Sequence, residues 1–224
     1  MNTEKIRLSA IIGVILALVF ASPLVADAVV RTHFFPIDDA RAEIDAFFAE
    51  DYVPIAFQIN PAGAVSMGYI PRTDDLSPSG WLLYELEDID DLEPILTAFI
   101  TEGFVPVDLT VYGETMYFLL LELDWHIAEW KITADTFSRQ GLVDTIARHR
   151  PVGFELYGLA FDGARVWYLF LDRGNPRGPE VEIAFMDNST ESVEQDAARR
   201  APTGARLRSF TTLTDDLILA VFAR

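Results

Sequence analysis

The chain has 224 residues, of which 50% are hydrophobic, and its formal net charge at pH 7 is -18. This charge argues against nucleic acids and anionic membrane surfaces as general partners, because binding to phosphate needs clustered lysine and arginine. The chain contains no cysteine, so an exported form would be stabilised by packing rather than by disulfide bonds. Its high apolar and aromatic content predicts a globular protein.

The first 28 residues have the layout of a secretory signal peptide. Two basic residues precede an apolar run at 11–21, which is followed by Pro23 and by small residues at 26–28. We therefore expect residues 1–28 to be removed and the mature protein to lie in the periplasm or outside the cell. The alternative is an uncleaved anchor in the inner membrane facing the periplasm, since the stretch 8–30 is just long enough to span a bilayer.

An internal repeat follows this segment. Residues 37–54 and 89–106 are identical at eight of eighteen aligned positions without a gap. In the second copy, apolar residues recur with helical period from Leu92 to Ile100, and the aspartates at 90–91 can cap such a helix. Each copy is therefore predicted to be a helix that runs through a short turn into a strand.

The segment PVDLTVYG, at Pro106–Gly113, is similar to the segment PVGFELYG at Pro151–Gly158. Apolar residues alternate with other residues in both copies, which predicts a strand with one buried face that ends at a glycine turn. On this alignment Asp108, Thr110 and Tyr112 face outward, and Tyr112 and Tyr157 occupy the same position.

Two further strands flank each helix and the strand that follows it. One lies before the helix and one after the glycine turn, so the repeating unit is strand, helix, strand, strand. The later strands at 116–123 and 165–171 are almost continuously apolar, which predicts burial on both faces. We predict an α+β protein of mostly antiparallel sheet with helices on one face, its other face covered by a second sheet or a partner. The four predicted units are residues 29–72, 81–123, 125–173 and 181–224.

The third unit carries a family resemblance through Trp125–Phe137, Pro151–Gly158 and Arg165–Phe170. It resembles a bacterial tandem-repeat module of about fifty residues, in which a Trp-started strand leads into a helix, a strand ending near Tyr and an apolar strand. The resemblance is best over 81–173, and the chain has Trp130-Lys131 where that family often has His-Gly. It implies a repeat architecture and an accessory or recognition role, and it brings no catalytic residue.

Patterns for catalysis and metal binding are incomplete. The segment 63–68 is similar to a nucleophile elbow, but it has one residue too many before Ser66, which falls on a predicted hairpin strand. The three histidines do not have the spacing of metal ligands. A hydrolase that uses the carboxylates of Glu85 and Asp88 is an alternative, although abundant acidic residues more simply form a solvated face. We expect no enzyme activity, no metal and no cofactor.

Two surface features suggest binding. The turn after the helix is acidic in the first two units and basic in the last two, where Arg148 and Arg150 lie, so two halves or two molecules can dock through complementary ends. Tyr112, Tyr157 and Trp167 can form an exposed platform for a protein partner or a glycan, unless they pack across strands.

The two halves of the chain also differ in charge. Residues 29–124 carry 3 basic and 19 acidic side chains, whereas residues 125–224 carry 12 and 14. The whole pattern favours an exported, non-catalytic binding or scaffold protein of the bacterial cell envelope. If the first segment is retained, the alternative is a membrane-anchored accessory subunit of an inner-membrane complex.

Overall fold

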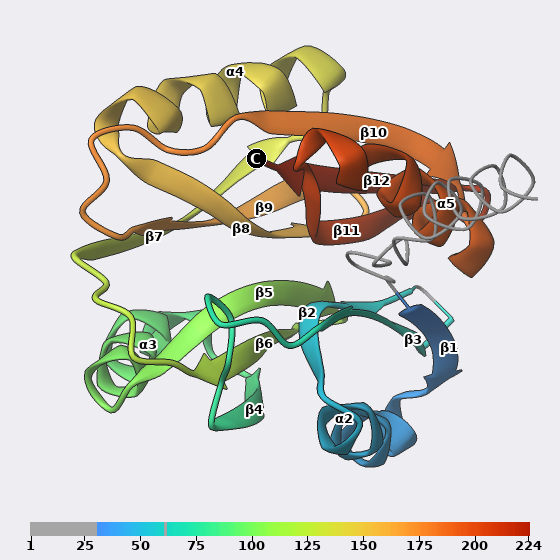
Figure 1. The fold of residues 1–224 in the computed structure, drawn as a ribbon. Helices are drawn as coiled ribbons and strands as arrows, with labels where there is room; N and C mark the ends of the chain where they lie inside the picture. The colour runs from blue at the N-terminus through green and yellow to red at the C-terminus, as the bar shows by residue number, and fades with distance from the viewer. Residues whose placement is uncertain (1–30, 61) are drawn as a thin grey trace, which may run out of the picture.

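A computed structural model describes residues 31–60 and 62–224 (Figure 1). The expected signal peptide or anchor therefore lies outside the described residues. Within those two ranges, no helix combines the length and the apolar character needed to cross a membrane.

Four units with the same order of elements follow one another, and the strands of each unit form a three-stranded antiparallel sheet whose last strand lies in the middle. The predicted α+β fold of four strand-helix-strand-strand repeats is thereby confirmed. Unit 1 contains β1 (Arg31–Pro36), α2 (Ala40–Ala49), β2 (Tyr52–Ile59) and β3 (Ala64–Pro71), and unit 2 contains β4 (Gly80–Leu86), α3 (Leu92–Thr101), β5 (Phe104–Tyr112) and β6 (Thr115–Glu122). Unit 3 contains β7 (Glu129–Thr136), α4 (Arg139–His149), β8 (Phe154–Phe161) and β9 (Arg165–Asp172), and unit 4 contains β10 (Val181–Asp187), α5 (Thr190–Arg200), β11 (Arg206–Thr214) and β12 (Leu217–Ala223).

The helix termini divide the units into two pairs. In units 1 and 2 a short 3-10 helix precedes the α-helix, whereas in units 3 and 4 it follows the α-helix and contains a proline. The hydroxyls of Ser138 and Ser189 accept backbone N–H groups at the starts of α4 and α5. The aspartates at 90–91 do not cap α3 with their side chains. Asp88 instead caps the 3-10 helix that precedes α3, by accepting the N–H of Asp90.

The second strands of the units, β2, β5, β8 and β11, lie at the centre of the molecule, and we call them the inner strands. Each inner strand contacts the inner strands of two neighbouring units, so that β2, β5, β8 and β11 form a closed ring around a central axis. The helices lie on the outside of this ring (Figure 1). Helix α5 of unit 4 also packs against β1 of unit 1, which brings the two ends of the repeat array together.

Neighbouring units cover the second face of each sheet. Residues Met116 to Leu121 of β6 are all buried, and β9 is buried over most of its length, as their continuous apolar sequences predict. One apolar cluster includes residues from all four units, from Ala40 of α2 to Phe222 of β12. The four units therefore share a core.

The inner strands of different units belong to separate sheets, so their backbone N–H groups need acceptors other than a strand ladder. At the junction of units 1 and 2, side chains of β5 supply these acceptors. Asp108 Oδ2 accepts the N–H of Phe57 at 2.7 Å, and Thr110 Oγ1 accepts the N–H of Ile59 at 3.3 Å. Asp108 and Thr110 are both buried, which corrects the prediction that they face outward.

The junction of units 3 and 4 is built in the same way, with side chains of β11 bonded to the backbone of β8. Ser209 Oγ accepts the N–H of Leu159 at 3.0 Å, and Thr211 Oγ1 accepts the N–H of Phe161 at 3.1 Å. The Ser209 hydroxyl also donates to Asp108 Oδ1 at 2.8 Å, so the two junctions are joined across the axis. Burial raises the pKa of Asp108 well above its usual value, while the hydrogen bonds that it accepts act in the opposite direction.

Candidate ligand cavity on the central axis

Each inner strand has a β-bulge near its start, and the four bulged residues take equivalent places in the four units. A bulge inserts one unpaired residue and can redirect its side chain. All four bulged side chains line one cavity of about 250 Å³ at this end of the axis. They are Ile55, Val107, Tyr157 and Arg208.

This register corrects the alignment of the two similar segments. Pro106 pairs with Leu120 immediately before the bulge of β5, and the equivalent residue of β8 is Leu156. Pro151 lies earlier, in the 3-10 helix that follows α4. Tyr157 therefore corresponds to Val107 and not to Tyr112, because an extra turn of helix in unit 3 delays the start of the strand.

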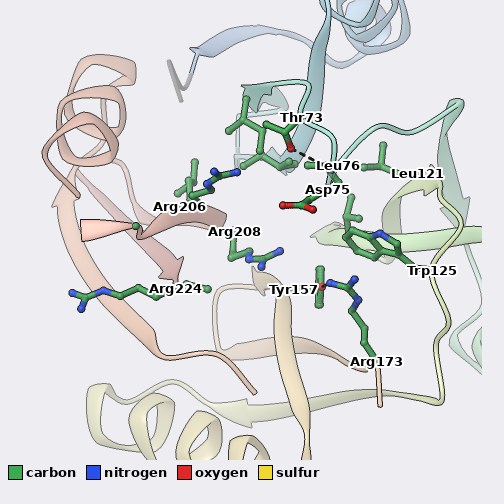
Figure 2. Close-up of a pocket in the computed structure, with 16 residues that line it drawn as sticks. Thr73, Asp75, Leu76, Leu121, Trp125, Tyr157, Arg173, Arg206, Arg208 and Arg224 are labelled. Carbon is green, nitrogen blue, oxygen red and sulfur yellow. Dashed lines mark hydrogen bonds between the residues drawn. The ribbon is translucent and has the colours of Figure 1, made fainter. Parts of the chain in front are cut away.

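Arginines from the second half of the chain reach the cavity. Arg206 and Arg208 come from β11, and Arg173 follows β9 (Figure 2). Among the described residues, none of these three guanidinium groups has a carboxylate within ion-pair distance. A fourth arginine, Arg224, is paired with Glu182 and extends away from the other three in Figure 2.

Two aromatic rings hold two of these guanidinium groups. Arg173 lies over the ring of Trp125 at 3.9 Å, and Arg208 lies over the ring of Tyr157 at 5.1 Å. The two rings meet edge to face with their centroids 6.0 Å apart. Trp125 lies in the segment before β7, whereas the family resemblance implies a strand that begins at this tryptophan.

Carboxylates near the cavity have specific places. Asp75, on the linker between units 1 and 2, reaches in from the wall opposite Arg206 and Arg208 (Figure 2). Glu155 is buried below Tyr157 and accepts its hydroxyl at 3.1 Å and the amide of Asn175 at 2.8 Å. Burial raises the pKa of Tyr157, so that this hydroxyl stays protonated.

The aromatic residues expected to form one platform are separated. Tyr157 is 2% exposed and belongs to the cavity, because it is a bulged residue rather than an outward strand residue. Tyr112 is 37% exposed, and its hydroxyl lies beside Gly63 in the β2–β3 turn. Trp167 donates its indole N–H to Asp162 at 2.8 Å and lines a second hollow with Met116.

The basic turn of unit 3 has a local structural contact. Arg150 donates to the carbonyl of Gly178 at 3.1 Å and thereby holds the linker between units 3 and 4, while Arg148 is exposed on the last turn of α4. Contacts between the two halves of the chain run through the inner strands and through α5 with β1. Docking of two molecules through these arginines stays a prediction.

The residues weighed for catalysis do not converge. Ser66 lies on β3, as expected, and is buried. Glu85 is 4.0 Å from Arg41, and Asp88 caps the 3-10 helix before α3. No group of three or more histidine or acidic side chains in the described part of the chain is arranged to hold a metal ion.

Sequence reasoning missed Trp125, Arg173, Arg206 and Arg208 as parts of one site. The signal that was available is the excess of arginine in the second half of a strongly acidic chain. No protein family matches the chain, and no curated protein shows significant similarity to it. The resemblance of unit 3 to bacterial tandem-repeat modules stays a prediction.

Proposed function

We propose that this protein is an exported, non-catalytic binding protein of the bacterial cell envelope, and that an anionic ligand occupies the cavity on the central axis. The observation that carries the proposal is the set of three arginines, Arg173, Arg206 and Arg208, without carboxylate partners among the described residues. They stand out because the chain carries 35 acidic and 17 basic side chains.

Guanidinium groups that face a concave site repel one another, and an oxyanion relieves this repulsion while accepting charge-assisted hydrogen bonds. Stacking on Trp125 and Tyr157 occupies the faces of Arg173 and Arg208. The N–H groups lie at the edges of a guanidinium, so stacked arginines can still donate to a ligand. This arrangement suits an anion held by several planar donors.

The four-unit ring acts in this proposal as a scaffold that brings distant segments to one site. The described lining residues are mostly apolar groups and donors, and their single carboxylate is Asp75. Such a lining favours holding a ligand over transferring protons, because general acid-base catalysis needs titratable groups placed against the reacting atoms. It therefore supports binding rather than a hydrolase.

The test is thermal unfolding with and without citrate, in the wild type and in the double variant Arg206→Gln/Arg208→Gln. We expect citrate to raise the Tm of the wild type and to leave the double variant almost unchanged. Arg177→Gln is the matched control, since Arg177 is an exposed arginine that does not line the cavity. Equal Tm shifts in all three proteins would contradict the proposal, because they would report a general solvent effect of the anion.

The exported location is tested separately. Intact mass of the protein purified from the envelope fraction should show removal of about 28 residues. Retention of that segment would instead support the alternative, an accessory subunit anchored in the inner membrane by residues 8–30.

A further inference from the structure

The charges facing the cavity do not balance. Among the residues that line the cavity, Arg173, Arg206 and Arg208 contribute three positive charges and Asp75 contributes one negative charge. Glu155 does not line the cavity, because it is buried and accepts the hydroxyl of Tyr157 and the amide of Asn175. Arg224 already has its partner in Glu182. The lining residues therefore carry an excess of two positive charges, and a monovalent anion compensates only half of this excess.

The wall between these charges is apolar. Ile55, Val107, Leu121 and Leu207 are all buried residues that line the cavity. An inorganic anion has no apolar surface to pack against this wall, whereas a short carbon chain would bury its own apolar surface there. The volume of about 250 Å³ also exceeds what one inorganic oxyanion fills.

The guanidinium groups lie on different sides of one tyrosine ring. Arg208 is over the face of Tyr157, whereas Arg173 donates to its hydroxyl at 3.4 Å from the side of Trp125 (Figure 2). In the same view the guanidinium groups of Arg206 and Arg208 lie on one side of the Tyr157 ring, and that of Arg173 lies on the other. The ring of Tyr157 therefore divides the donors, with Arg206 and Arg208 on one side of it and Arg173 on the other.

From these three observations we propose that the ligand is an organic anion with two negatively charged ends joined by a short apolar body. One charged end is held by Arg206 and Arg208, the other by Arg173, and the body lies on the apolar wall. The inference rests on the proposed function, and it names the ligand class of that same site. Asp75 is an internal competitor in this arrangement, because its carboxylate faces the arginines of β11.

The experiment separates charge from apolar body with three probes, measured by isothermal titration calorimetry at one low ionic strength. Adipate has two carboxylates and an apolar body, hexanoate has one carboxylate and a body of the same length, and sulfate has two charges and no apolar body. We expect adipate to bind at least about tenfold more tightly than either of the other two. Arg208→Gln and Arg173→Gln should each reduce this preference, while Arg177→Gln should retain it.

The fluorescence of Trp125 provides a second measurement of adipate binding, because this indole is in contact with Arg173 in the cavity. The titration should change the fluorescence of the wild type and have no such effect in Trp125→Phe. Asp75→Asn should tighten adipate binding by about threefold, since it removes a like charge from the site. Asp74→Asn, an exposed neighbour that does not line the cavity, is its control.

Two negative outcomes have different meanings. If hexanoate or sulfate binds as tightly as adipate, the ligand class is wrong, and anion binding by the cavity stands. If none of these probes and no citrate binds to the wild type, the proposed function itself is overturned.

Discussion

The two junctions between paired units use the same backbone geometry with different chemistry. Asp108 and Thr110 bind the backbone of β2, and Ser209 and Thr211 occupy the equivalent positions against β8. The first junction relies on a buried carboxylate and the second on a hydroxyl. Because Ser209 also donates to Asp108, the carboxylate receives donors from both sides of the axis.

The comparison shows how a repeat can keep its fold while its positions acquire separate roles. Immediately after each bulge the four units have Ala56, Asp108, Gly158 and Ser209, and the small residue of unit 3 leaves room for the carboxylate of unit 2. The bulged residues differ even more, since two are aliphatic, one is tyrosine and one is arginine. Units 1 and 2 therefore provide most of the apolar wall of the cavity, and units 3 and 4 provide most of its donors.

Breaking the junction of units 1 and 2 should lower the free energy of unfolding more than any other change described below. We expect Asp108→Ala to lower the free energy of unfolding by about 3 kcal/mol, because it leaves the N–H of Phe57 without its acceptor and opens a small void. Urea unfolding followed by circular dichroism measures this loss. Asp88→Ala is the control, since Asp88 caps an exposed turn and should lose about 1 kcal/mol. Equal losses would show that Asp108 is not a special support of the ring.

Filling the space beside Asp108 should cause the next largest loss in the free energy of unfolding. A Cβ added at Gly158 would lie 2.8 Å from Asp108 Oδ1 and 2.9 Å from the backbone nitrogen of Leu109. Backbone cannot move aside as a flexible side chain can, so Gly158→Ala should destabilise the protein by about 2 kcal/mol. The same urea titration measures it. A variant as stable as the wild type would mean that the inner strands separate easily at this point.

Thr110 and Thr211 make equivalent hydrogen bonds at the two junctions, so their substitution tests whether the junctions are equally strong. Thr110→Val and Thr211→Val keep the side-chain shape and remove the acceptor for Ile59 or Phe161, so each should lower the free energy of unfolding by about 1 kcal/mol. Measured in one denaturant series, the two losses should agree closely. A large difference between them would show that the two junctions are not equivalent in strength.

The smallest expected effect is a pH dependence that belongs to the first junction alone. Since burial raises the pKa of Asp108, the folded chain keeps this proton to higher pH than the unfolded chain, whose value is near 3.8. The stability contribution of this group is therefore complete below the unfolded-state pKa and declines as pH rises through the folded-state pKa.

Unfolding free energies of the wild type and Asp108→Asn, measured from about pH 4 to about pH 8, should show the wild type losing stability relative to the variant as pH rises. Thr211→Val should not reproduce this trend, because Thr211 does not titrate in that range and its hydroxyl binds the N–H of Phe161 rather than Asp108. A difference that moved in favour of the wild type with rising pH would show that the hydrogen bonds to Asp108 outweigh its burial.

The sequence by itself determined the repeating unit, its four copies and the burial of β6 and β9. These features follow from local periodicity, since helical and strand patterns place apolar side chains on definite faces over a few residues. It also determined the excess of arginine in the second half, although not where those arginines meet.

Only the tertiary structure decided what the inner strands do. The strand pattern predicts that Asp108 faces outward. In the structure it is a buried acceptor, because Phe57 and Ser209, 51 and 101 residues away, supply its donors. Likewise a bulge shifts the register by one residue, so Tyr157 turns toward the axis instead of the surface. The ring places four such bulges at one end of the axis, and the cavity exists only because distant strands close around it.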